Sequence, residues 1–339
     1  MTTMRRLFFS DLHLHTWTYG AHTMDSGFNS RLWYQWLALQ QMIKYIDEHD
    51  IRYVYFTGDL FHTHANIPAQ ALSVAGELFR QLKIRDIKVR AIPGNHDFAS
   101  RSGNIHSLSW LPDGVLDGDW LDDDIQVCAL PYTDDEEKLK RFLGSVEKMA
   151  DGTIVMLHQG VAGVPLSSGF LMDEKLTPDM IPTNVVAFTG HYHFFRRVTT
   201  NLTVVGNLTP LNWNDIDQQK GWVIYDDETR TVEQIKQTVA PEFRLVGRDH
   251  RECGAHFVRC SDAVSSGEQE EVRQGLIKAG ALTVEFTAAL ATEGTKGEGA
   301  WSGEEVTLDH LVKTFEAKDM EPRRREVGSQ VREGNYVRP

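Results

Sequence analysis

The sequence has few cysteines and no long apolar run. Its 339 residues include only three cysteines, Cys128, Cys253 and Cys260, which form no CxxC or zinc-finger spacing, so a disulfide framework is not expected. No apolar stretch approaches the roughly 18 residues that a membrane helix needs. The N-terminus reaches Asp11 after a few apolar residues, too soon for a signal peptide. We therefore expect a cytoplasmic protein without membrane association.

An excess of basic residues is also lacking. The 35 Lys and Arg residues face 48 Asp and Glu residues, giving a net charge of −13, which argues against a generally basic nucleic-acid binder. With 41% hydrophobic and 24% charged residues, the composition is that of an ordinary globular protein and excludes disorder, collagen and coiled coil. The length indicates roughly two domains.

Strand and helix patterns alternate through the first hundred residues. Apolar residues at intervals of three and four predict helices over residues 30–49 and 68–82. β-branched and aromatic runs predict strands at residues 6–10, 52–57 and 88–92. This alternation favours a layered α/β domain that gathers polar groups at one edge of its sheet.

The pattern changes in the rest of the chain. We expect strands at residues 125–130, 153–157 and 185–189, a charged helix at 134–149, and a hairpin series over 196–237 with strands at 197–200, 203–205, 221–225 and 231–236. The core domain is expected to cover residues 1–240. A small α+β cap over 241–290 follows, with strands at 243–246, 255–260 and 282–286 and a helix at 268–279. Residues 291–339 are expected to form a linker, an amphipathic helix at 306–315 and a polar tail.

Polar clusters follow the predicted strands. They are Asp11-Leu12-His13, Gly58-Asp59, Gly94-Asn95-His96-Asp97, Leu157-His158 and Gly190-His191-Tyr192-His193. Residues two apart in an extended strand point to the same side, so Asp11 with His13, and His191 with His193, can each present two ligands to one site. Glycine lets the backbone turn sharply and approach a metal closely.

The residue types of these clusters indicate a divalent metal centre. Asp, Asn and His ligands without a thiolate favour Mn, Fe or Zn over a structural thiolate zinc site. Seven such ligands are too many for one ion, whereas two ions that share a carboxylate use them all, an arrangement common in phosphoester hydrolysis. Each cluster alone fits an ordinary turn, but their combination at successive strand ends favours the metal centre.

The order Asp-x-His, Gly-Asp, Gly-Asn-His-Asp, His and Gly-His-x-His over residues 8–193 resembles the calcineurin-like metallophosphoesterase superfamily. The resemblance implies a four-layer αββα sandwich. It also implies a first metal held by Asp11, His13, Asp59 and His193. A second metal would be held by Asp59, Asn95, His158 and His191, with Asp59 as the bridge.

The resemblance gives the two residues after Asn95 different functions. His96 would contact the substrate phosphate or protonate the leaving oxygen rather than bind metal. Asp97 would orient His96 and raise its basicity, as a carboxylate does for imidazole.

Several features are similar to the SbcD-type nuclease subunit of bacteria and phages. They are Phe9-Ser10-Asp11-Leu12-His13-Leu14, Gly58-Asp59-Leu60-Phe61-His62, Gly190-His191-Tyr192-His193, Gly206-Asn207, and the layout of core, cap and C-terminal helix. The similarity implies a Mn-dependent 3′-to-5′ DNA exonuclease, with endonuclease activity as an open question. It also implies a homodimer that docks on an SMC-like SbcC-type ATPase.

Some residues depart from that family pattern or leave alternatives open. His15 stands where the family usually has glycine, and it could contact substrate or be a packed loop histidine; the same holds for His62. The Arg323–Arg325 cluster could contact DNA or be solvated. Gly-Asn-His-Asp argues against a protein phosphatase, while a small-molecule phosphodiesterase and a non-catalytic scaffold subunit remain the rival interpretations.

Overall fold

The computed structural model describes residues 4–64, 66–99, 105–111, 120–122, 126–166 and 169–287. The chain divides into two compact units, residues 1–289 and 290–339, and all described residues lie in the first. The expected linker, C-terminal helix and tail, including Arg323–Arg325, lie outside the described residues. The predicted boundaries at residues 240 and 290 stay predictions.

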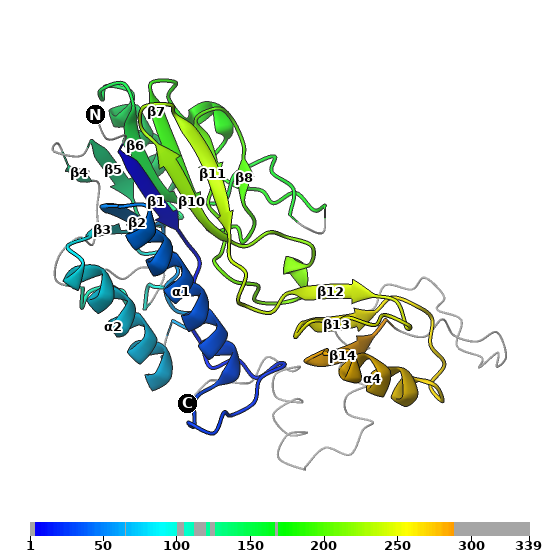
Figure 1. Ribbon diagram of the computed structural model, residues 1–339. Coiled ribbons are helices and arrows are strands. Elements are labelled where there is room, and N and C mark those ends of the chain that lie inside the picture. The colour runs from blue at the N-terminus through cyan, green and yellow to red at the C-terminus, as the bar shows by residue number, and fades with distance from the viewer. Residues whose placement is uncertain are drawn as a thin grey trace, which may run out of the picture. The chain divides into compact units, whose positions relative to one another are not determined.

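The first sheet contains five strands in the order β11-β10-β1-β2-β3 (Figure 1). Strands β1 (Arg5–Phe9), β2 (Tyr53–Phe56) and β3 (Lys88–Ala91) are parallel, and β10 (Gly221–Asp226) runs antiparallel to β1 and pairs with β11 (Thr231–Lys236). Helices α1 (Ser30–Glu48) and α2 (Ala69–Ile84) connect the parallel strands. The predicted strand-helix alternation of this half is confirmed.

The second sheet contains six strands in the order β4-β5-β6-β7-β9-β8. Strands β5 (Val127–Leu130), β6 (Thr153–His158), β7 (Val185–Gly190) and β9 (Leu202–Val204) are parallel, whereas the edge strands β4 (Trp120–Asp122) and β8 (Arg196–Arg197) are antiparallel to their neighbours. Helix α3 (Glu136–Val146) follows β5, and two short 3-10 helices cover Pro178–Met180 and Trp213–Asp215. Strand β4 was not predicted.

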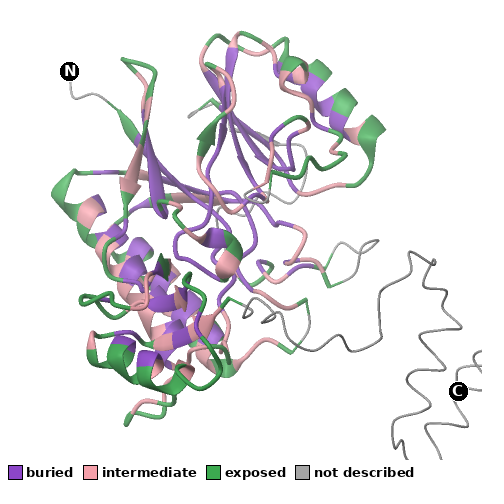
Figure 2. Cartoon of the chain, turned by 90° about the vertical axis from the view of Figure 1, so that its right-hand side faces the viewer, coloured by how far each residue is buried: buried purple, intermediate pink, exposed green. Residues whose placement is uncertain are grey.

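Alternating side chains of the central strands enter different cores. In β1, Leu7 and Phe9 pack with α1 and α2, whereas Phe8 faces the second sheet and stacks on Phe188 of β7 with ring centroids 3.8 Å apart. Val155 of β6 packs with α3 on the opposite face of the second sheet. Inner strands of both sheets, such as β1, β6 and β7, are therefore buried on both faces, and Figure 2 shows buried strands inside the molecule. This burial explains why these strands are nearly continuous apolar runs.

The predicted hairpin series over residues 196–237 is wrong as a single unit. Strands β8 and β9 complete the second sheet, whereas the β10–β11 hairpin returns to the first sheet beside β1. Both segments are short and rich in β-branched residues, so their sequences do not indicate which sheet each one joins. The pairing is decided by long-range packing, for example of Val223 and Tyr225 into the core between the sheets.

A third sheet belongs to the expected cap. Strands β12 (Phe243–Val246), β13 (Phe257–Cys260) and β14 (Thr283–Phe286) are all parallel, and α4 (Gln269–Lys278) lies against β14. They enclose a small apolar core of their own. The three cysteines are free and buried.

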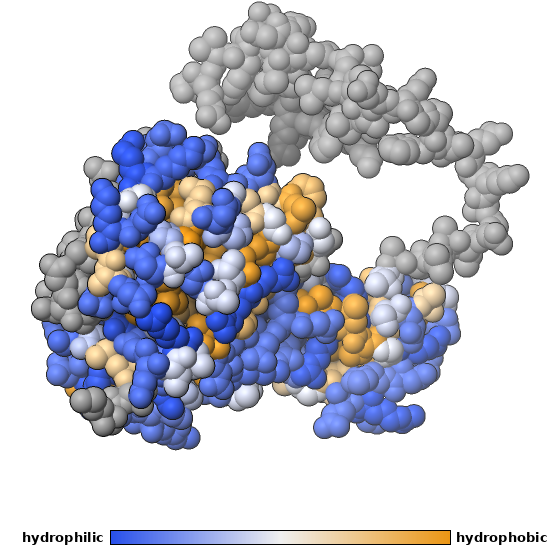
Figure 3. Space-filling model, turned by 90° about the horizontal axis from the view of Figure 1, so that it is seen from above, coloured by the Kyte–Doolittle hydropathy of each residue, from blue (hydrophilic) through white to orange (hydrophobic). Residues whose placement is uncertain are grey.

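The surface agrees with the composition. The face seen in Figure 3 is mostly hydrophilic, with hydrophobic side chains in separate areas. Among the residues that the structure describes, no helix combines the length and the apolar character that a membrane crossing requires. The mixed α/β fold inferred from the sequence is confirmed.

Candidate metal centre

The predicted ligands gather where parallel strands of both sheets end. Asp11 and His13 follow β1, Asp59 follows β2, Asn95 follows β3, His158 ends β6, and His191 and His193 follow β7. Because the carboxyl ends of parallel strands meet at one edge of a sheet, and the two sheets pack face to face, residues 180 positions apart come into contact. The structure therefore brings all seven residues together.

The backbone at this edge adopts an unusual conformation. Asp11, His13, Asp59 and His191 have φ angles of 49°, 44°, 62° and 89°, in the left-handed region that non-glycine residues rarely adopt. Each such residue costs of the order of 1–3 kcal/mol, and the cost is tolerated when the surrounding structure fixes it. Hydrogen bonds from Asp11 N to Gly58 O (2.9 Å) and from His13 N to Asp59 O (3.1 Å) provide that support.

The first predicted ligand set is contiguous. The Nε2 atoms of His13 and His193 lie 3.1 Å apart. His13 Nε2 is also 3.5 Å from Asp59 Oδ2 and 4.0 Å from Asp11 Oδ1. One ligand atom from each of Asp11, His13 and His193 lies within 4.8 Å of the others, so the three side chains can hold a metal ion together.

The second predicted set lies on the other side of Asp59. His158 Nε2 is 3.1 Å from Asn95 Oδ1, and His191 Nδ1 is 2.9 Å from the same oxygen. His158 Nε2 is 3.4 Å from Asp59 Oδ2. The same Asp59 oxygen thus faces both ligand sets at nearly equal distances.

These separations fit ions bound between the side chains. Ligands that each lie about 2.0–2.2 Å from one divalent ion are roughly 3 Å apart when the angle between them is near 90°. Asp11, His13, Asp59 and His158 are at most 2% exposed, so their carboxylates and imidazoles are removed from water. Buried polar groups normally have partners, so an apolar or structural explanation of the cluster is unfavourable.

Three glycines make room for this packing. A Cβ atom on Gly58 would clash with the His158 ring and lie 2.7 Å from Gly94 N. A Cβ atom on Gly94 would clash with the Asp59 carboxylate, and one on Gly190 would lie 2.5 Å from the Thr57 carbonyl. The glycines are therefore required by the close approach of β2, β3, β6 and β7, as the sequence pattern indicated.

Charge and burial compete at Asp59 and His158. Burial alone raises the pKa of Asp59, but His158, His13 and His96 outweigh it and lower that pKa well below its ordinary value. Burial lowers the pKa of His158, but the neighbouring Asp59 and Asp11 raise it to about 9. Burial also raises the pKa of Asp11 to about 7, although His158 opposes the shift. In the metal-free protein, a protonated His158 thus provides positive charge that an ion would replace.

Hydrogen bonds from neighbouring backbone groups orient two of the ligands. His158 Nδ1 lies 2.5 Å from the Thr57 carbonyl oxygen, so a proton on Nδ1 leaves Nε2 free to bind metal. The backbone N–H of His191 donates to both oxygens of Asp11 at 3.2 Å.

Asp97 has different partners from those predicted. Its carboxylate accepts hydrogen bonds from the backbone N–H groups of Asp59 (2.8 Å), Leu60 (3.0 Å) and Gly94 (2.9 Å), and from Ser107 Oγ (2.7 Å). The predicted Asp97–His96 contact is absent from the described hydrogen bonds because these donors occupy the carboxylate. Asp97 instead fixes the two loops that carry Asp59 and Asn95.

His96 is oriented by a carbonyl group. Its Nδ1 lies 2.7 Å from His62 O, and its backbone N–H donates to Asp59 Oδ1 at 2.8 Å. The His96 ring lies edge to face with the ring of His13, with centroids 4.7 Å apart. A proton on Nδ1 that bonds the carbonyl leaves His96 Nε2 available for proton transfer at this edge.

His15 and His62 belong to an aromatic cluster beside the site. The His62 ring lies 5.4 Å from His15 and 4.5 Å from Trp17, measured between centroids. Ring nitrogens of His13, His62 and His96 also lie within 4.8 Å of one another. His62 thus lies at the edge of the predicted metal centre, and the His15 ring lies next to the His62 ring. Burial lowers the pKa of both rings, to about 4 at His62.

Sequence reasoning missed a buried ion pair beside His193. Lys220, which is 1% exposed, donates from Nζ to His193 O (2.6 Å), Asp215 Oδ1 (2.5 Å) and Gln218 Oε1 (2.8 Å). The one available signal was a lysine that directly precedes the buried strand β10. A charged residue at a strand end is usually exposed, so that signal alone did not indicate a site.

The chain is similar to known proteins in its N-terminal part. Residues 4–195 match the family described as calcineurin-like phosphoesterase. A DNA double-strand break repair protein Mre11 from Methanocaldococcus jannaschii is 35% identical over 153 residues, which cover 41% of this chain and 40% of that protein.

Two solved structures have weaker similarity. A dimetal phosphatase from Danio rerio aligns with 12% identity and a TM-score of 0.39, over 66% of this chain and 92% of that one. The nuclease MPE from Pseudomonas putida aligns with 14% identity and a TM-score of 0.29, over 68% and 87%.

Proposed function

Because the chain belongs to the calcineurin-like phosphoesterase family, we propose that it is a two-metal phosphodiesterase that cleaves DNA, similar to an SbcD-type nuclease subunit. One observation carries this proposal. The Oδ2 atom of Asp59 lies 3.5 Å from His13 Nε2 in one ligand set and 3.4 Å from His158 Nε2 in the other. A carboxylate oxygen shared in this way suits two ions rather than one.

The ligand sets would hold two divalent ions, with Mn²⁺ as our first candidate. Asp11, His13, Asp59 and His193 would hold one, and Asp59, Asn95, His158 and His191 the other. When bound, such a pair lowers the pKa of a shared water, binds phosphate oxygens and stabilises the leaving oxygen.

The remaining site residues would act on substrate or support the loops. His96, with Nδ1 bonded to a carbonyl, would protonate the leaving 3′ oxygen from Nε2. Asp97 would act as a positioning residue through the backbone groups that it binds. His62, at the edge of the centre, would contact the substrate phosphate, with His15 behind it.

DNA as substrate is supported by the Mre11 relative, which is described as a DNA double-strand break repair protein. By that likeness we propose 3′-to-5′ exonuclease activity, with endonuclease activity as a second one, in DNA repair or recombination. We also propose a homodimer that works in the cytoplasm with an SbcC-type ATPase. The net charge of −13 is compatible with DNA cleavage, because two ions would add about four positive charges at the edge.

Purified protein tests the proposal. With Mn²⁺ we expect it to shorten a 5′-labelled duplex from its 3′ end, alone or with its ATPase partner, and to lose this activity with EDTA. Hydrolysis of a small phosphodiester without any DNA cleavage would instead identify a small-molecule phosphodiesterase. Absence of bound metal together with absence of hydrolysis would support the scaffold interpretation.

A further inference from the structure

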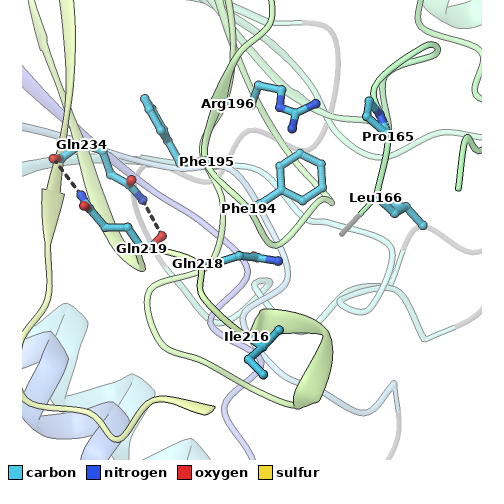
Figure 4. Close-up of a pocket in the computed structure, with 9 residues that line it drawn as sticks. All are labelled: Pro165, Leu166, Phe194, Phe195, Arg196, Ile216, Gln218, Gln219 and Gln234. Carbon is cyan, nitrogen blue, oxygen red and sulfur yellow. Dashed lines mark hydrogen bonds between the residues drawn. The ribbon is translucent and has the colours of Figure 1, made fainter. Parts of the chain in front are cut away.

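Two adjacent cavities border the segment His191–Arg196. The inner one, of about 270 Å³, is lined by His191, His193, Phe194 and Asn214 among others. The outer one, of about 340 Å³, is lined by Phe194 and Arg196 and is shown in Figure 4. Phe194 and Leu166 line both cavities, so a continuous trough leads from two predicted metal ligands to Arg196.

The Phe194 ring is held in a defined position. It stacks on Tyr192 with centroids 5.4 Å apart and an interplanar angle of 29°. The hydroxyl of Tyr192 donates to Glu174 Oε1 at 3.0 Å, and this hydrogen bond fixes the Tyr192 ring on which Phe194 stacks. Gly206, at φ +76°, lets the chain pass so close that a Cβ atom there would lie 2.7 Å from the Phe194 carbonyl carbon. Phe194 is therefore a pre-organised aromatic surface beside the metal centre.

The polar groups of the trough suit an anionic ligand with a planar ring. Among the described residues that line the outer cavity, Arg196 is the only charged one, and its guanidinium lies 5.2 Å from the centre of the Phe194 ring. Within the described part of the chain this guanidinium makes no hydrogen bond or ion pair. In the inner cavity the one carboxylate, Asp215, is bound by Lys220. A trough with a free cation is unusual in a chain of net charge −13.

We propose that this trough binds an unpaired nucleotide of the substrate strand, next to the phosphate that is cleaved. This inference rests on the proposed function and specifies its substrate. The base stacks on Phe194, Asn214 contacts the base edge, and Arg196 binds the neighbouring phosphate. Because the face of a base is accessible only outside the duplex stack, the site favours frayed or single-stranded ends over blunt ones.

An abasic substrate tests the stacking contact without changing the protein. Two oligonucleotides carry an abasic nucleotide, one on each side of the cleaved phosphate. For the oligonucleotide that lacks the stacked base, we expect KM to rise about tenfold, which corresponds to the loss of one base–aromatic stacking contact. Phe194→Ala should cause the same rise on the unmodified strand and no further rise on the abasic one, whereas Phe194→Trp should keep the wild-type KM.

Fluorescence of 2-aminopurine at the same position gives a second measurement on the wild-type protein. Quenching is expected on binding to the wild type. Arg196→Gln should reduce the slope of log affinity against log salt concentration for oligonucleotide binding by about 1, because one phosphate contact is lost. Arg197→Gln, whose side chain donates to Thr200 O instead of lining the trough, is the matched control and should behave as wild type.

The outcomes separate the two hypotheses. If the wild type does not cleave DNA at all, the proposed function fails. A different outcome is that the wild type cleaves DNA while the rises in KM caused by Phe194→Ala and by the abasic nucleotide multiply in combination. That result, or a lack of 2-aminopurine quenching, would show that the nucleotide site is wrong although the protein is a nuclease.

Discussion

The metal edge and the cap are stabilised by different kinds of contact. At the edge, Asp11, His13, Asp59 and His158 are at most 2% exposed, and four predicted ligands have a left-handed backbone. In the cap, residues 243–287, the charged pair of Arg259 and Glu285 is about one-third exposed, and the interior is apolar. One region concentrates polar groups that need a ligand, while the other resembles an ordinary small core.

The cap meets the core through aromatic rings around one buried cation. Arg31 of α1 lies 5.3, 5.5 and 5.1 Å from the ring centres of Trp17, Phe243 and Phe257. Its guanidinium donates to the carbonyl oxygens of Tyr19, Pro210 and Leu211. The comparison teaches that function and stability are separable here. Changes at the edge should abolish activity with little loss of stability, and changes at Arg31 should do the reverse.

The largest effect is expected for Asp59→Ala. The variant removes the oxygen that faces both ligand sets, so both ions should be lost and hydrolysis should fall by roughly 10³-fold or more. Metal analysis of the purified protein checks the prediction. Stability should change little, since the substitution also removes the cost of burying the Asp59 carboxylate. A variant that retains two ions would contradict the proposed bridge.

His96→Ala should separate metal binding from catalysis. Because His96 lies in neither proposed ligand set, both ions should remain, while hydrolysis falls about 10²- to 10⁴-fold through loss of proton transfer. Metal content and the rate on labelled DNA are measured on one preparation. His250→Ala, in an exposed part of the cap, is the matched control. Loss of an ion from the His96 variant would indicate that His96 is a ligand, as its proximity to His13 and His62 also allows.

Lys220→Met should have an intermediate effect. Lys220 fixes the His193 carbonyl, so its loss should weaken metal binding about 10- to 100-fold, as is usual when a residue that orients a metal ligand is replaced. It should also destabilise the protein by about 3 kcal/mol, because Asp215 stays buried without its partner.

The double variant Lys220→Met/Asp215→Leu is the control for that effect. It should recover the stability but not the metal affinity, as shown by thermal unfolding and Mn²⁺ titration. Recovery of both would mean that Lys220 acts on stability alone.

The smallest effect on hydrolysis is expected for Arg31→Met. The variant loses cation–π contacts and three hydrogen bonds, so the free energy of unfolding should fall by about 2 kcal/mol. The rate on DNA under saturating Mn²⁺ should stay within about twofold of wild type, because Arg31 contacts no predicted ligand. A strong loss of activity in a folded variant would show that the two regions are coupled.

The ligands of the metal edge could be predicted from the sequence, but the partners of its supporting residues could not, for a physical reason. Metal ligands need particular residue types at short spacings, so Asp11-x-His13 and Gly94-Asn95-His96 are readable without knowing the fold. The hydrogen-bond partners of Asp97 and Lys220 could not be predicted from the sequence. They depend on which loops and strands, far apart in the chain, come within hydrogen-bond distance.

Strand pairing shows the same limit. The two halves of residues 196–237 both have short strands but join different sheets, because packing against distant strands decides the pairing. The ring of contacts around Arg31 also joins α1 to the cap across more than 200 residues, and no local pattern indicates it.

Anomalous X-ray diffraction from Mn²⁺-loaded crystals tests the central claim most directly. Two manganese peaks are predicted, both bound to Asp59 Oδ2, with one adjacent to His13 and His193 and the other adjacent to His158 and His191. A single peak, or a peak held by His62 and His96 in place of Asp59, would contradict the two-metal centre.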